Sequence, residues 1–163
     1  MKKFLFPIML VFLLFVAGCA STATQETNTS ADRVLNIEDF EGDIVYIGER
    51  FFATQITDIM LNSTEQYLGR AIRYEGIFWI SYWPPSGRDH YYVIRFTDGC
   101  CGSHHGSVGF ELYLNGIAPV PDGAWVEVTG VLERSQGDSI QHVHLRAISI
   151  VELEERGTDF VSN

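Results

Sequence analysis

The sequence predicts a mainly β fold: a small five-stranded OB-like barrel preceded by one helix, after a signal peptide and a disordered tether. Two observations lead to this prediction. From Arg70 onward, apolar and polar residues alternate with a period of two, and turn residues divide the region into five segments. Just before it, residues 49–61 place apolar side chains at helical spacing. This order favours a closed OB-type barrel, with a small sandwich or another small barrel as the alternative.

The region before the strands is expected to be mostly helical. Residues 43–47 read as a short strand or an extended lead-in. Within residues 49–61, four apolar side chains share one helix face: Phe52, Ile56, Ile59 and Met60. Asn62 ends this helix. Residues 63–66 resemble a capping box, which would start a short helical turn that ends at Gly69.

The five strands are expected over residues 70–80, 90–97, 107–114, 124–133 and 140–153. Gly76 in the first strand and Gly130 in the fourth stand where a barrel strand bends sharply. The third strand turns four apolar residues inward: Val108, Phe110, Leu112 and Leu114. The polar tail from Glu154 is expected to be ordered only in part.

Three groups of strand residues bear on the outer surface of the predicted barrel. Six aromatic residues crowd the first hairpin, and any that are exposed would form a binding surface: Phe78, Trp79, Tyr82, Trp83, Tyr91 and Tyr92. Three carboxylates are expected as single charges at outward strand positions: Glu75, Glu111 and Glu127. In the second strand, alternation puts one further set on a common face: Tyr92, Ile94 and Phe96.

The amino-terminal segment has the layout of a bacterial lipoprotein signal. Lys2 and Lys3 precede an apolar run over residues 4–16, which is too short to span a bilayer comfortably. Ala17, Gly18 and Cys19 follow, as in a lipobox whose cysteine is acylated. We therefore expect a signal peptide over residues 1–18, an acylated cysteine with a flexible tether over 19–36, and an OB-like domain over 37–163. The alternatives are an ordinary signal peptide with a chance cysteine and an uncleaved anchor helix.

This signal predicts a lipid-anchored protein on the extracytoplasmic face of a bacterial membrane. Removing residues 1–18 removes both lysines, which leaves nine arginines against 21 acidic residues and a formal charge of −12. Such a surface repels nucleic acid and anionic headgroups. Nucleic acid is therefore not an expected partner, and the membrane is contacted through the lipid anchor.

A cysteine- and histidine-rich loop follows the second strand. Cys100 and Cys101 lie within a few residues of His104 and His105, between glycines that permit tight turns. Thiolates and imidazoles bind zinc, and thiolates also favour cuprous copper. His142 and His144 leave the same strand face roughly 6.6 Å apart at the backbone, so they are additional candidate ligands. His90 is a further candidate.

Other interpretations of these residues stay open. Cys100 and Cys101 could form a strained vicinal disulfide, because adjacent Cα atoms are only about 3.8 Å apart. They could also be packed thiols in a tight turn. His142 and His144 could simply be a solvated strand face. No phosphate-binding loop, nucleophile elbow or zinc-protease motif occurs in the sequence, so no catalytic residue and no enzymatic activity are predicted.

Four stretches in order resemble an OB-like domain of proteins assigned as bacterial membrane permease subunits and of small related lipoproteins. They are residues 67–77, 92–96, 99–102 and 125–130. The resemblance covers about residues 44–153, and the paired cysteine is its most specific element. In that family small or acidic residues often follow the cysteines, where this chain has His104 and His105. The activity of this family is uncharacterised. The resemblance therefore implies a fold and, through the permease subunits, an association with membrane transport, but no specific activity.

The expected function is binding. The first hypothesis is a lipid-anchored protein that binds zinc or copper at the cysteine loop, with help from His142 and His144, in support of a membrane permease. The second is a non-catalytic interaction module of an envelope complex, in which the cysteines are structural. A thiol–disulfide enzyme is a third possibility, but the sequence lacks the Cys-x-x-Cys spacing of that chemistry.

Overall fold

Seven strands and two helices form the part of the chain that the computed structural model describes, which is residue 37 and residues 40–98, 106–135 and 142–161. In chain order they are β1 (Ile44–Tyr46), α1 (Phe52–Leu61), α2 (Thr64–Tyr67), β2 (Ala71–Trp83), β3 (Arg88–Thr97), β4 (Gly106–Tyr113), β5 (Trp125–Ser135), β6 (His142–Glu152) and β7 (Phe160–Val161). The expected signal peptide, the tether and the cysteine-rich loop lie outside these residues. Neither of the two helices is long and apolar enough to cross a membrane.

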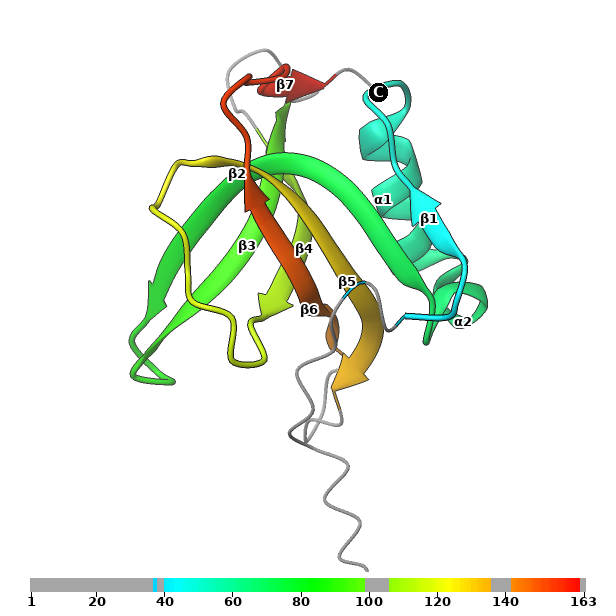
Figure 1. Cartoon of the computed structure of the whole chain (residues 1–163), viewed down its shortest axis with the longest axis horizontal. Coiled ribbons are helices and arrows are strands. Elements are labelled where there is room, and N and C mark those ends of the chain that lie inside the picture. The colour runs from blue at the N-terminus through cyan, green and yellow to red at the C-terminus, as the bar shows by residue number, and fades with distance from the viewer. Residues whose placement is uncertain (1–36, 38–39, 99–105, 136–141, 162–163) are drawn as a thin grey trace, which may run out of the picture. The chain divides into compact units, whose positions relative to one another are not determined.

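A closed barrel is the centre of the fold. The long strand β2 pairs with β5 from Ala71 to Ile77 and with β3 from Ile77 to Trp83, both antiparallel. β3 then pairs with β4, β4 runs parallel to β6, and β6 returns antiparallel to β5. The circuit β2–β3–β4–β6–β5 confirms the predicted five-stranded OB-like barrel (Figure 1).

The glycines at the two predicted bends lie where neighbouring strands come very close. At Gly76, one residue before β2 changes partners, a Cβ atom would lie 2.8 Å from the carbonyl oxygen of Ile94. At Gly130, the register between β5 and β6 shifts, and a Cβ atom would lie 2.9 Å from the Cβ of Leu145. Only glycine permits these close backbone approaches, and both allow the strands to curve around the core.

The core is filled by α1 and by the inward residues of all five barrel strands. Fully buried examples are Phe52, Ile56, Ile72, Phe78, Val93, Phe110, Leu132 and Leu145. Of the four residues of the third strand predicted to point inward, Phe110 and Leu112 are buried in this core, and Val108 and Leu114 are partly buried and pack against it. In β3, Tyr91 and Val93 face the core, whereas Tyr92, Ile94 and Phe96 pack in a smaller outer cluster with Trp125.

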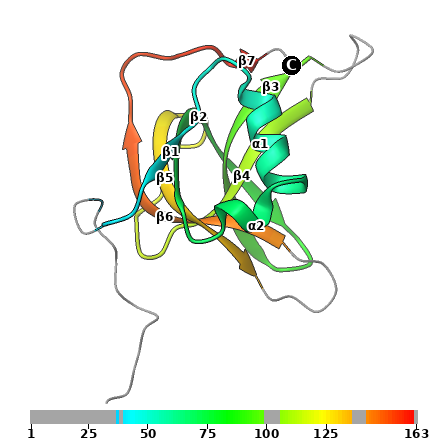
Figure 2. The ribbon, with the colours of Figure 1, turned by 90° about the vertical axis from the view of Figure 1, so that its right-hand side faces the viewer.

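The helical region differs from the prediction in two respects. α1 starts at Phe52 rather than at residue 49, after Phe51 in a left-handed conformation, and Met60 is exposed rather than part of the buried face. The capping box is wrong, because the Ser63 side chain makes no capping hydrogen bond. The Thr64 hydroxyl instead donates to the carbonyls of Ile59 (2.7 Å) and Met60 (2.9 Å) at the end of α1. Figure 2 shows α1 against the barrel beside β4.

The carboxyl-terminal tail contains a strand that the sequence did not reveal. β7 pairs in parallel with β3 through Phe96 and Thr97, just beyond the point where β2 leaves β3. The Phe96 N–H also donates to the Asp159 carbonyl at 2.8 Å. A strand of only two residues, Phe160 and Val161, shows too little periodicity to be recognised from the sequence. Its formation depends on pairing with the edge of β3.

A Tyr74→Phe variant is expected to lose roughly 1–3 kcal/mol of unfolding free energy. The buried Tyr74 hydroxyl donates to the Val93 carbonyl at 2.8 Å and accepts from the Phe110 N–H at 3.1 Å. Its removal takes one hydrogen-bonding partner from a buried carbonyl of β3 and from a buried N–H of β4. Urea unfolding measures the effect, with Tyr82→Phe as the control, because the Tyr82 side chain is exposed. Equal stability of the two variants would contradict this role.

Candidate functional site

A groove of about 520 Å³ crosses the outer surface of the barrel and is the candidate functional site. We call it the outer groove. Three aromatic and three titratable residues line it, together with two serines: Trp83, Tyr92, Tyr113, His90, Glu111 and His142, with Ser81 and Ser135. They come from five different strands, so the barrel as a whole builds the groove.

Strand alternation explains why these side chains gather on the outside. Phe110 and Leu112 point into the core, so the residues between and after them, Glu111 and Tyr113, face outward. The same period turns His90 and Tyr92 outward on β3, and His142 and His144 outward on β6. The pairing of β4 with both β3 and β6 then places these residues next to one another.

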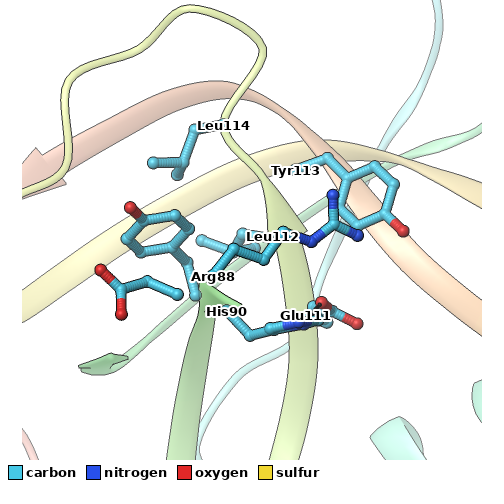
Figure 3. Close-up of a pocket in the computed structure, with 8 residues that line it drawn as sticks. Arg88, His90, Glu111, Leu112, Tyr113 and Leu114 are labelled. Carbon is cyan, nitrogen blue, oxygen red and sulfur yellow. Dashed lines mark hydrogen bonds and ion pairs between the residues drawn. The ribbon is translucent and has the colours of Figure 1, made fainter. Parts of the chain in front are cut away.

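Glu111 lies between two imidazoles at the base of the groove. Its Oε1 is 2.6 Å from Nδ1 of His90, and its Oε2 is 3.2 Å from Nδ1 of His142. Figure 3 shows His90 and Glu111 side by side in an adjoining pocket that shares them. Only 8 % of Glu111 is exposed, so its carboxylate is largely removed from solvent but remains hydrogen-bonded. Burial, and secondarily the Glu111 charge, raises the pKa of the neighbouring Tyr92.

Ser86, in the hairpin between β2 and β3, adds a third side chain to the His90–Glu111 hydrogen bond. Ser86 Oγ lies 3.1 Å from Nε2 of His90, so Ser86, His90 and Glu111 follow the order of a serine–histidine–acid triad. The backbone N–H groups of Ser86 and Gly87 both donate to the Trp83 carbonyl at 3.0 Å, so neither is available to stabilise an oxyanion. The arrangement therefore orients the His90 ring and gives little support to a nucleophilic reaction.

His144 belongs to a separate environment beside the groove. Its ring stacks on Tyr113 with centroids 3.8 Å apart, and its Nε2 lies 3.8 Å from Glu133 Oε2. The side chain is almost fully buried. Burial lowers the pKa of His144, and the charges of Glu133 and Glu111 only partly oppose this effect.

Replacing His144 with Phe is expected to reduce the acid sensitivity of the fold. The unfolded chain binds a proton at His144 near the ordinary pKa of about 6.5 and the folded chain binds it less readily, so stability is lost as pH falls below that value. His144→Phe keeps a ring on Tyr113 but cannot titrate. Thermal unfolding at pH 7.5 and pH 5.5 should therefore show a smaller loss of Tm, by a few degrees, in the variant. Equal losses would contradict the assignment, since all other histidines are common to both proteins.

Of the six residues that the sequence grouped as metal ligands, the structure describes only His142 and His144. Cys100, Cys101, His104 and His105 lie outside the described residues, as does the predicted lipid attachment residue Cys19. His142 contacts Glu111 whereas His144 faces Glu133, so the two imidazoles turn to different carboxylates. No group of three or more His, Cys, Asp or Glu within residues 40–98, 106–135 and 142–161 is arranged to hold a metal ion. The metal site stays a prediction.

Glu111 is the site residue that the sequence interpretation undervalued. It does face outward, as expected, but it is buried and paired with two histidines instead of being solvated. No local signal distinguishes it from Glu75 or Glu127, because its partners lie 21 and 31 positions away along the chain. Only the alignment of β3, β4 and β6 in the barrel brings the three residues together.

Comparison with known proteins gives one family. No curated protein matches the chain. The model of the DUF1980 C-terminal domain, a family of uncharacterised domains, matches residues 21–160. This match covers the barrel, both helices and nearly all of the outer strands. The chain therefore belongs to the DUF1980 C-terminal domain family.

Proposed function

We propose that this protein is a lipid-anchored, extracytoplasmic binding protein that uses the outer groove and catalyses no reaction. The observation that carries the proposal is the outer groove itself, which is lined by three aromatic rings and by the His90–Glu111–His142 cluster. Its volume of about 520 Å³ is in the range of small-molecule sites. The second and third strands of OB barrels, here β3 and β4, commonly provide the binding surface.

The absence of catalysis is part of the proposal and is supported by the hydrogen bonding around Ser86. Its hydroxyl is also within 3.0 Å of the Trp83 carbonyl, which competes with His90 for the single hydroxyl proton. A nucleophilic serine requires that proton to be directed to the histidine. The Ser86–His90–Glu111 arrangement is better suited to holding the groove in shape for a ligand.

A thermal-shift panel on the full-length protein in detergent micelles tests binding in the outer groove. Choline, maltose, a neutral dipeptide and Zn²⁺ serve as probes of four ligand classes. At least one probe should raise the Tm of the natural protein and of a Tyr46→Leu control, which removes an exposed aromatic ring outside the groove. The same probe should not raise the Tm of a Trp83→Leu/Tyr113→Leu double variant. No response to any probe, or an equal response of the double variant, would overturn the proposal.

Membrane attachment rests on Cys19 and its preceding residues. We propose that Cys19 carries the lipid and becomes the first residue of the mature chain, with the domain held outside the cytoplasmic membrane. The natural protein should incorporate radiolabelled palmitate and partition into a detergent phase. Cys19→Ser should do neither, and labelling that survives this substitution would contradict the anchor.

Binding of zinc or copper by Cys100, Cys101, His104 and His105 is a further part of the proposal, supported by the chemistry of these ligands. Participation of His142 and His144 would require them to leave Glu111 and Glu133. Metal analysis of the purified full-length protein separates the two ligand sets. Stoichiometric metal that is lost in Cys100→Ser/Cys101→Ser but retained in His142→Gln/His144→Gln would assign the ion to the loop. A metal-free natural protein would remove the metal from the proposal.

The exposed aromatic residues of the first hairpin favour a second function, that of an interaction module in an envelope complex. Three aromatic side chains of β2 are exposed: Trp79, Tyr82 and Trp83. Exposed tryptophan and tyrosine residues often form the centre of protein interfaces. The resemblance to permease-associated domains makes a membrane permease the proposed partner. Co-purification of a permease with the natural protein but not with Trp79→Ser/Tyr82→Ser would support this function, and equal recovery would oppose it.

A further inference from the structure

The charge and composition of the outer groove point to a class of ligand. Among its lining residues there is one carboxylate, Glu111, and there is no arginine or lysine. Arg88 and Asp89 line the adjoining pocket, and their formal charges sum to zero. The formal charge of the residues that line the groove, with histidines counted as uncharged, is therefore −1. Because Glu111 is only 8 % exposed, this charge is weakly screened by solvent.

The aromatic rings of the outer groove are open to a ligand. Trp83 is 57 % exposed and Tyr113 is 40 % exposed. The His144 ring stacks on Tyr113 with centroids 3.8 Å apart, which orients the Tyr113 ring where it lines the groove. Tyr92 completes the set of three rings. The faces of such rings carry negative electrostatic potential and attract cations.

The hydrogen bonding of Glu111 restricts which cation fits. Each carboxylate oxygen already has an imidazole nitrogen close to it: Nδ1 of His90 is hydrogen-bonded to Oε1 at 2.6 Å, and Nδ1 of His142 lies 3.2 Å from Oε2. A primary ammonium group needs up to three acceptors of its own and would have to share the Glu111 oxygens with these two imidazoles. A quaternary ammonium group has no N–H and needs only aromatic faces and nearby negative charge.

We propose that the outer groove binds a quaternary ammonium group, with Trp83, Tyr92 and Tyr113 around the cation and Glu111 supplying the charge. This inference rests on the proposed binding function and names its ligand class. The overall acidity of the mature chain, with a formal charge of −12 and no lysine, favours the approach of such a cation from solution.

Choline and its uncharged isostere 3,3-dimethyl-1-butanol provide the test, because they share a shape and differ in charge. Titration calorimetry of the full-length protein in micelles at pH 8, above the ordinary pKa of imidazole, should show choline binding at least tenfold more tightly than the isostere. Glu111→Gln and Tyr113→Leu should each weaken choline binding at least tenfold. Glu127→Gln and Tyr46→Leu, which change a carboxylate and a ring outside the groove, should bind choline as the natural protein does.

Several results would overturn the ligand class. Equal binding of the isostere would mean that charge is not recognised, and undiminished binding by Tyr113→Leu would mean that the groove is not the site. Tyr113→Leu serves as the deciding variant if Glu111→Gln does not fold. If choline does not bind but another panel probe stabilises the protein through Trp83 and Tyr113, the quaternary ammonium inference falls and the binding function stands. If no probe acts through these rings, both fall.

Discussion

A Gly109→Ala variant is expected to lose roughly 3 kcal/mol or more of unfolding free energy, a large part of what a domain of this size has. Gly109 lies in β4 opposite Ile94 of β3. A Cβ atom built at Gly109 would overlap the carbonyl oxygen of Val93 and would lie 2.9 Å from the Cα of Ile94. Both obstacles are backbone atoms, so no side-chain rotation relieves the clash, and the β3–β4 ladder would have to separate.

Urea unfolding of the full-length protein measures this loss. Gly48→Ala is the matched control, because a Cβ atom there meets nothing within 4 Å, and its stability should change by less than about 0.5 kcal/mol. Gly130→Ala should fall between the two, since a Cβ atom there would lie 2.9 Å from the Leu145 Cβ and 3.0 Å from the Arg146 carbonyl oxygen, a less severe overlap than at Gly109. A Gly109→Ala protein as stable as Gly48→Ala would show that β3 and β4 are not held at this separation.

Gly109 also illustrates how far the sequence predicts the fold. Alternation predicted the strands and the inward residues of β4, because burial of one strand face leaves a direct record in the residue pattern. The bends at Gly76 and Gly130 were predicted because a glycine inside a strand is unusual. The requirement for glycine at position 109 comes from the backbone of the neighbouring strand β3. Local sequence patterns do not reveal how closely two strands approach each other.

The candidate site likewise combines features that one strand predicts with features that depend on a neighbouring strand. The spacing of His142 and His144 correctly put both on one strand face, but it could not show that β4 would offer Glu111 to the first and Tyr113 to the second. Their neighbours depend on the parallel pairing of β4 with β6, which joins segments about 30 residues apart. The ligands of the predicted metal loop lie outside the described residues, so that part of the site rests on sequence alone.

Arg95 is the other residue whose replacement should have a large effect, because it fills the opening where β2 separates from β3. The β2–β3 ladder ends at Ile77 and Ile94, and the Arg95 Nε–H donates to the Glu75 carbonyl at 2.8 Å just beyond it. Only 2 % of the Arg95 residue is exposed. Burial lowers the pKa of Arg95, and the carboxylates of Glu49 and Glu75 oppose this effect, so the guanidinium remains a cation.

The guanidinium is held between two aromatic rings. Its Cζ lies 4.8 Å from the Phe52 ring centroid and 4.9 Å from that of Trp125, so it joins α1 to β5 across the end of β3. Truncation to Ala would leave a cavity, remove both cation–π contacts and leave the Glu75 carbonyl without this donor. We expect Arg95→Ala to lower the unfolding free energy by roughly 3–5 kcal/mol.

Two further variants separate charge from shape at Arg95. Arg95→Lys keeps the charge but loses the planar group that stacks on both rings, and Arg95→Met fills much of the volume without charge. If the stacked guanidinium is what stabilises the split between β2 and β3, both variants should lie between the natural protein and Arg95→Ala in urea unfolding. An Arg95→Met protein of natural stability would show that volume alone is required there. An Arg95→Lys protein of natural stability would show that the charge suffices.

The loss of Arg95 should also loosen the edge of β3 on which β7 depends, because β7 pairs with β3 beginning at Phe96. Hydrogen exchange at the Phe96 amide should therefore rise most in Arg95→Ala.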